Sequence, residues 1–188
     1  MIPAFTVIYD ANVLYSSFLR DLLMRLALTD LYRARWSEDI HREWMENLAE
    51  NRPDLVDKIP RIRALMDHNV RDCLVTGYEE LIDGLHLPDP KDRHVLAAAI
   101  KTQAQEIVTY NLRDFPSATL ARYGLEAQHP DAFVLCQLDL HREKVLSELE
   151  THRSELKQPP LTPDEYCNMV QRQRMPETAA FLRQTWSC

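Results

Sequence analysis

The side chains best placed for chemistry are four acids that lie far apart along the chain: Asp10, Glu43, Asp92 and Asp114. Asp10 directly follows an apolar, β-branched run typical of a buried strand, and Asp114 comes just after a second such run. In open parallel sheets, ligand sites gather at the carboxyl ends of the strands. Two strand ends and two helices that each bring an acid to one sheet edge would leave like charges repelling. We therefore expect a cation among them.

Carboxylate oxygens select hard cations, which predicts Mg²⁺ or Mn²⁺, with several waters retained and with either one ion or two. Asn12, Asn111 and Asp89 are candidate supporting residues because they lie close to the acids in sequence. Arg93 and Arg113 each adjoin a proposed ligand, and they are candidates for holding flanking phosphates. The alternative for these arginines is simple solvation or pairing with a nearby acid.

Each acid also has a plainer interpretation. Asp10 can cap the helix that follows it, and Asp92 can complement a helix dipole. Glu43 borders the apolar face of its helix, where a carboxylate is expensive to bury unless a cationic group meets it. Asp114 can shape a turn. For Asp89, the role of helix N-cap is the interpretation that we favour.

The apolar spacing predicts an alternation of strands and helices over the first two thirds of the chain. The expected elements are a strand at 4–9, a helical stretch over 14–26, a helix capped by Ser37, a helix over 55–66 divided at Pro60, a helix opened by 89–92, and strands at 107–110 and 125–127. Only three glycines and no hairpin signals are present. This pattern indicates an α/β fold with a parallel sheet.

From about residue 138 onward the pattern becomes helical throughout. One helix carries Val145, Leu149 and Leu156 and ends before a proline pair, the segment 162–165 fits a capping box, and Pro176 opens a last helix. We therefore divide the chain into a main domain at 1–138 and a C-terminal helical extension at 139–188.

Composition bounds the class of protein. The chain has 188 residues, 45% of them hydrophobic, which is enough for one full-sized core. A formal net charge of −7 argues against RNA binding by a broad basic face, but bound cations can supply the charge that a phosphodiester needs. The cysteines, Cys73, Cys136, Cys167 and Cys188, form no C-x-x-C pair, which indicates a reducing cytoplasm. No apolar run approaches the ~20 residues that cross a bilayer, so we expect a soluble protein without a membrane partner.

Other enzyme classes lose support because their motifs are missing. There is no phosphate-binding glycine loop, no nucleophile elbow and no zinc-ligand spacing among the seven histidines. A haloacid-dehalogenase-like phosphatase would use Asp10 as a nucleophile, but it needs a second acid where Asn12 stands. A phosphoacceptor signalling domain is weakened in the same way, since it also needs an acidic pair and a lysine.

Four segments in order, 9–14, 37–43, 92–99 and 108–115, carry a family resemblance: they include Tyr-Asp-Ala-Asn-Val-Leu at the first and Asn-Leu-Arg-Asp-Phe at the last. Together the segments resemble the PIN-domain family, and specifically VapC-type toxins, over roughly residues 4 to 135. The C-terminal helices resemble the extension of one VapC subgroup.

The resemblance implies a PIN-like three-layer α/β/α fold with a parallel central sheet, and Mg²⁺- or Mn²⁺-dependent cleavage of RNA by the toxin of a toxin–antitoxin pair. It makes the acidic quartet both catalytic and metal-binding: Asp10, Glu43, Asp92 and Asp114. Many relatives have an acid where Asn111 stands, which ranks Asp114 below the first and third of these. A cognate antitoxin and a homodimer are the implied partners. The alternatives are a PIN-domain nuclease of RNA processing and an inactive PIN-fold module that binds RNA or protein.

Overall fold

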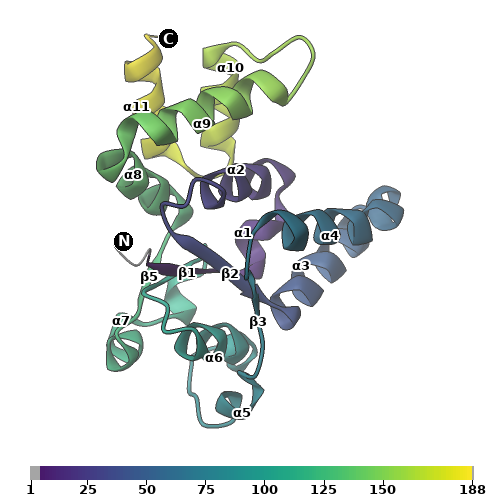
Figure 1. Cartoon of the computed structure of the whole chain (residues 1–188), viewed down its shortest axis with the longest axis vertical. Coiled ribbons are helices and arrows are strands. Elements are labelled where there is room, and N and C mark those ends of the chain that lie inside the picture. Colours follow the sequence, from purple (N-terminus) through teal and green to yellow (C-terminus); the bar gives the residue numbers. More distant parts are fainter. Residues whose placement is uncertain (1–4, 188) are drawn as a thin grey trace.

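The computed structural model describes residues 5–187, so residue 4 of the first expected strand and Cys188 lie outside the described part of the chain. Its centre is a parallel sheet of five strands in the order β3-β2-β1-β4-β5 (Figure 1). The strands are β1 (Thr6–Tyr9), β2 (Arg33–Ser37), β3 (Leu74–Val75), β4 (Glu106–Val108) and β5 (Glu126–Gln128).

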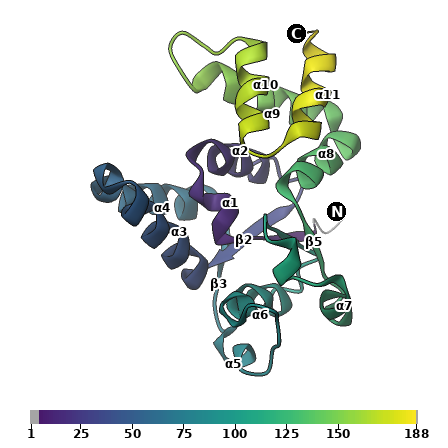
Figure 2. The same ribbon diagram turned by 180° about the vertical axis from the view of Figure 1, so that it is seen from behind.

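Helices cover both faces of this sheet, which confirms the three-layer α/β/α arrangement (Figures 1 and 2). The helices on one face are α1 (Ala11–Tyr15), α2 (Ser17–Ala27), α3 (Glu38–Asn51) and α4 (Ile59–Asn69), and those on the other are α5 (Glu79–Ile82), α6 (Arg93–Lys101) and α7 (Ser117–Leu120). Short 3-10 helices span Pro53–Lys58, Pro90–Asp92, Leu112–Asp114 and Ala121–Tyr123. Because both faces are covered, all four residues of β1 are buried, and the strand reads as one continuous apolar run.

The helical stretch expected over 14–26 is divided at Ser16. This residue has an extended backbone, and its hydroxyl accepts a hydrogen bond from the Leu19 N–H, so it ends α1 and caps α2. Leu14 and Phe18 are buried on either side of the break. The apolar spacing therefore continues across the division and did not reveal it.

Strands β2 and β3 were not predicted. In β2 the buried side chains Ala34 and Trp36 alternate with Arg33 and Arg35, which is the period of a strand with one polar face. The arginines masked this pattern among stronger apolar runs. Strand β3 is only two residues long and pairs with the end of β2.

Several local signals gave the correct helix boundaries. The Ser37 hydroxyl accepts from the Ile40 N–H and caps α3, and the Asp89 carboxylate accepts from the Lys91 N–H. Pro60 lies in the first turn of α4, which directly follows a 3-10 helix, so the helical stretch is divided next to this proline as expected. Caps of this kind each stabilise a helix by about 1 kcal/mol.

The C-terminal region consists of α8 (Pro130–Leu140), α9 (Arg142–Glu155), α10 (Pro163–Arg172) and α11 (Pro176–Trp186). The capping box at Thr162 and the helix start at Pro176 are confirmed. These helices gather at one end of the molecule, beside α2 (Figures 1 and 2). The division of the chain at residue 138 stays a prediction, and that residue lies inside α8.

Polar contacts fix this region to the α/β part. His152 Nε2 of α9 lies 3.1 Å from Asp21 Oδ2 of α2, and Arg25 Nη2 lies 2.7 Å from Glu155 Oε2. His152 is fully buried, and its Nδ1 atom lies 2.7 Å from the Tyr166 hydroxyl of α10. Within residues 5–187, no helix is both long and apolar enough to span a membrane.

Candidate active site

Asp10 lies at the carboxyl end of the central strand β1 and is 3% exposed. The register pairs Tyr9 with Val108, so Asp10 stands opposite Thr109, one step beyond both strands. Its Oδ1 accepts from the Ala11 N–H at 2.7 Å, and its Oδ2 accepts from the Thr109 hydroxyl at 2.7 Å. The carboxylate is thus a helix cap and a fixed polar group at the sheet edge at once.

Asn12 joins Asp10 to the loop that follows β4. Its Nδ2 donates to Asp10 Oδ2 at 2.6 Å and to the Thr109 hydroxyl at 2.9 Å, and its Oδ1 accepts from the Tyr110 N–H at 3.1 Å. The Asn111 N–H in turn donates to the Thr109 hydroxyl at 2.9 Å. These hydrogen bonds fix the orientation of the Asp10 carboxylate.

Asp92 ends the 3-10 helix that precedes α6. Its Oδ2 atom is buried and has no hydrogen-bond partner among the described residues. The pKa of Asp92 is raised to about 7. Burial is the largest cause, and it is followed by the negative charges of Asp10, Asp89, Asp114 and Glu43. Two acids far apart in the chain and two nearer ones therefore act on this carboxylate.

The pKa of Asp10 is raised to about 6, first by burial, and the charge of Glu43 adds to this. The hydrogen bonds from Thr109 and Ala11 favour the ionised form but do not outweigh these effects. Raised pKa values in neighbouring carboxyl groups are typical of functional sites, because the fold has gathered charges that repel one another.

Glu43 reaches the site from α3, and its Oε1 lies 2.9 Å from Nε2 of His94 on α6. His94 is 8% exposed. Burial opposes the charged form of His94, but the hydrogen bond and charge of Glu43 outweigh it, so the pKa of His94 is raised. The cationic partner expected for a half-buried Glu43 is therefore a histidine that sequence reasoning did not single out.

These residues surround a polar hollow of about 610 Å³. Among the described residues, its lining includes six carboxylates against one lysine: Asp10, Glu43, Glu46, Glu50, Asp89, Asp92 and Lys91. Asn12 and Asn111 also line it. Asp114 does not line it, although its charge acts on Asp92.

The two arginines proposed to hold phosphates also lie outside this lining. Arg93 Nε donates to the Pro90 carbonyl at 2.9 Å, and Arg113 is exposed. Their phosphate-binding role stays a prediction. Lys91, which sequence reasoning passed over, is the basic side chain within the lining.

Thr109 and His94 are further site residues that were not singled out. Thr109 could have been found from the parallel pairing of β1 with β4, because residues that follow paired strand ends stand side by side. No comparable signal existed for His94, whose partner Glu43 is 51 residues away in the chain.

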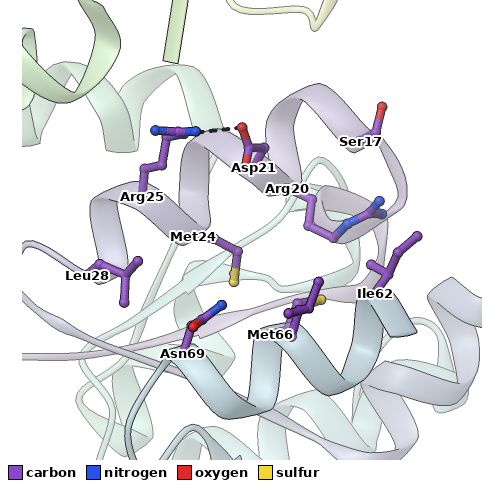
Figure 3. A pocket seen from close by; sticks show the side chains of 10 residues that line it. Ser17, Arg20, Asp21, Met24, Arg25, Leu28, Ile62, Met66 and Asn69 are labelled. Atoms are coloured by element: carbon purple, nitrogen blue, oxygen red, sulfur yellow. Dashed lines mark hydrogen bonds and ion pairs between the residues drawn. The ribbon is translucent and has the colours of Figure 1, made fainter. Parts of the chain in front are cut away.

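A second hollow, of about 420 Å³, lies between α2 and α4 (Figure 3). Its lining is mainly apolar and includes Met24, Leu28 and Met66. Among the described residues that line it, one carboxylate is present, Asp21, and it pairs with Arg25 at 3.2 Å. This hollow has no grouped acids, so the chemistry belongs to the polar hollow.

The sequence model of the PIN domain matches residues 6–113, more than half of the chain, and the chain therefore belongs to the PIN-domain family. A second model, described as the VapC50 C-terminal domain, matches residues 130–184. The resemblance to a VapC-type PIN protein with a C-terminal extension is thus confirmed.

Over 107 residues the chain is 40% identical to a protein named "Putative ribonuclease VapC50" of Mycobacterium tuberculosis (strain ATCC 25618 / H37Rv). This match covers 57% of the chain and 62% of that protein, so it spans less than two thirds of the relative's length. Among solved structures, none matches the chain at a significant level.

Proposed function

We propose that the chain is a metal-dependent endoribonuclease that acts through Asp10, Glu43 and Asp92, with Asp114 beside them. The observation that carries this proposal is the buried, unpaired Oδ2 of Asp92 among other carboxylates. Leaving such an oxygen without a partner is expensive unless a cation comes to it. The name of the VapC50 relative supports RNA as the substrate.

The donor set fits a hard divalent cation. The side chains around Asp92 offer oxygen atoms, which suit Mg²⁺ or Mn²⁺. No three histidine, cysteine or acidic side chains within residues 5–187 form a complete ligand group. Mg²⁺ commonly uses one or two carboxylates and keeps several waters, so a complete protein cage is not required. We assign Asp10 and Asp92 as the main ligands, with Glu43 and Asp114 as further ones.

When bound, the cation would lower the pKa of a water molecule and balance the charge on the leaving oxygen. The chain's own residues supply order and charge. Asn12 and Thr109 hold Asp10 in one orientation, and His94 holds Glu43. Lys91 at the hollow offers a positive group to a phosphate. No side-chain nucleophile is needed in this scheme.

We further propose that this ribonuclease is the toxin of a toxin–antitoxin pair in the cytoplasm and that it forms a homodimer inhibited by a cognate antitoxin. The matches to the two VapC50 descriptions support this assignment. A small neighbouring gene for a DNA-binding protein would support the toxin role, whereas an isolated gene would favour RNA processing. An inactive binding module is disfavoured because the acids are present.

Cleavage of RNA by the purified full-length chain tests the activity. We expect total cellular RNA to be cut with Mg²⁺ or Mn²⁺ and to stay intact in excess EDTA. Asp92→Asn should lower the turnover on the order of a hundredfold or more, because it removes charge where the cation is held.

The matched control is Asp57→Asn, which alters an exposed acid of the 3-10 helix before α4 and should cleave at the rate of the unchanged chain. Asp92→Asn is purified in the same way as the unchanged chain, so any RNA cleavage that remains in this variant reveals a contaminating ribonuclease. Full cleavage in EDTA, or equal rates for the two variants, would overturn the proposed function.

A further inference from the structure

The connection between α10 and α11 packs against the loop that follows β4. The Tyr110 hydroxyl donates to the Gln173 carbonyl at 2.7 Å, and the Ser16 hydroxyl donates to Gln173 Oε1 at 2.6 Å. Met175, two residues on, is fully buried. Figure 2 shows that this connection lies at the ends of α10 and α11 that face the α/β part. The C-terminal region is therefore anchored to the PIN domain at this point.

Both anchors adjoin the acidic hollow. The Tyr110 N–H donates to Asn12 Oδ1, and Tyr110 directly precedes Asn111, while Ser16 directly follows Tyr15. Asn12, Asn111 and Tyr15 all line the hollow. The connection between α10 and α11 is thus placed at the rim of the candidate active site.

This connection carries an exposed arginine, Arg174. Its guanidinium carbon lies 5.0 Å from the centre of the Tyr110 ring, in a cation–π arrangement. Among residues 5–187, no carboxylate lies within ion-pair distance of Arg174. The ring contact orients the guanidinium and leaves its N–H donors available to a ligand.

The backbone at Arg174 is not one that arginine favours. Its φ of 60° lies in the left-handed region just after a helix end, where glycine is the usual residue. A side chain in that region costs about 1 kcal/mol, and an exposed cation–π contact contributes about 0.5–1 kcal/mol in return. Arginine therefore adds little to stability that glycine would not provide, so a change of Arg174 to glycine can test its role without disturbing the fold.

Charge supplies the ligand class. The hollow holds six carboxylates and one lysine among the described residues, and the whole chain has a net charge of −7. An RNA strand that enters the hollow therefore needs positive groups at its rim. Arg174 stands beside the Tyr110 ring, which itself lies 5.1 Å from the His129 ring. A guanidinium set among aromatic rings is chemistry that holds single-stranded RNA.

We propose that Arg174, oriented by Tyr110, binds a phosphate of the RNA strand that flanks the scissile one, so that the C-terminal region completes the RNA-binding site. This inference rests on the proposed ribonuclease function. It gives the C-terminal helices a role in holding the substrate rather than in the chemical step.

The test is steady-state cleavage of a labelled single-stranded RNA by the full-length chain with Mg²⁺. The variant is Arg174→Gly, because glycine favours the observed backbone and should keep the fold. We expect KM to rise about fivefold, as for the loss of one exposed charge contact, with kcat within about twofold of the unchanged chain. The slope of log KM against the logarithm of the salt concentration should decrease by about 0.7, which is the value for one phosphate contact on a single strand.

Two further variants act as controls. Arg174→Lys keeps the charge and should restore most of the affinity. Arg172→Ala removes an exposed charge at the end of α10 that, among the described residues, makes no cation–π contact with Tyr110, and it should leave KM unchanged. The thermal unfolding temperature of each variant is measured beside KM.

If the unchanged chain cleaves RNA and Arg174→Gly keeps its KM and salt dependence, the role of Arg174 is overturned and the ribonuclease function stands. Equal effects of Arg174→Gly and Arg172→Ala would also overturn it, since they would indicate general electrostatics. If the unchanged chain does not cleave RNA at all, the proposed function fails and this inference fails with it.

Discussion

Asp10 is both a helix cap and an acid of the candidate active site. The plain reading, a helix cap, and the chemical reading, a strand-end acid in a site, describe the same carboxylate, because Oδ1 accepts from the Ala11 N–H while Oδ2 is held by Asn12 and Thr109. The sequence alone places Asp10 at a strand end and Asp92 at a helix start, because strand ends and helix starts leave local signals. Thr109 and His94 were not found from sequence, since their roles depend on pairing across the fold.

Asp92 gives a stability prediction at this scale. In metal-free protein its unpaired oxygen repels the other acids, so Asp92→Asn should leave the free energy of unfolding unchanged or raise it by about 1 kcal/mol. Urea unfolding in the presence of EDTA measures this. A loss of more than about 1 kcal/mol would contradict this prediction and would mean that the Asp92 carboxylate stabilises the metal-free fold.

Asp131 is the matched control for Asp92. It is also a buried aspartate, but its carboxylate accepts from the Glu177 and Thr178 N–H groups and from the Thr178 hydroxyl at the start of α11. Asp131→Asn should therefore lower the free energy of unfolding by about 2 kcal/mol. If the free energy of unfolding rises in Asp92→Asn and falls in Asp131→Asn, the first carboxylate is placed to bind a ligand and the second stabilises the fold.

At the scale of elements, the position of Glu43 depends on how α3 packs against α4. His41 of α3 is fully buried, its Nε2 lies 2.8 Å from Asp67 Oδ1 of α4, and its Nδ1 accepts from the Trp44 indole N–H. The Trp36 indole N–H of β2 also donates to Asp67 Oδ1. One carboxylate thus joins a strand and two helices.

The contacts of Asp67 with His41 and Trp36 predict that the free energy of unfolding decreases in acid. Burial lowers the pKa of His41 below its usual 6.5 and outweighs the opposing charge of Asp67, so the folded protein resists protonation there. The stability that this neutral histidine contributes is present above pH 6.5 and is lost as the pH falls through its folded pKa. For Asp67, hydrogen bonds outweigh burial and lower the pKa, so its contribution is lost in the same direction at lower pH.

Urea unfolding between pH 8 and pH 5 measures the effect. The free energy of unfolding should fall less steeply with pH in His41→Gln than in the unchanged chain, whereas His68→Gln, which alters an exposed histidine of α4, should follow the unchanged chain. If the free energy of unfolding changes with pH in the same way in all three proteins, the contact between His41 and Asp67 is not a source of acid sensitivity.

The elements themselves were predicted unevenly, for physical reasons. Helix caps such as Ser37 and Thr162 depend on residues within one turn, so the sequence alone places them. Strand β2 depends on which face the sheet buries, and that is decided by residues distant in the chain. The break at Ser16 is a local cap, but it was missed because the apolar spacing continues across it. Helix α8 was missed because the helical extension was taken to begin after residue 138.

At the scale of the whole molecule, a chain of net charge −7 has six acids around one hollow and an arginine near its rim. The parallel sheet was predicted from the alternation of elements, and its two helical layers were implied by the family resemblance. The position of the C-terminal helices was not predicted, since it is set by contacts such as Asp21 with His152 and Ser16 with Gln173. We therefore propose that divalent cations link this acidic protein to a polyanionic RNA.

Calorimetric titration of Mn²⁺ into the metal-free, full-length chain tests that link without RNA. We predict saturable binding that Asp10→Asn weakens at least about tenfold, while Asp57→Asn leaves it unchanged. Asparagine keeps the oxygen that caps Ala11 but replaces the oxygen that Asn12 and Thr109 contact, so the thermal unfolding temperature of Asp10→Asn is measured beside the titration. Binding of equal affinity in Asp10→Asn, or no saturable binding by the unchanged chain, would contradict the account.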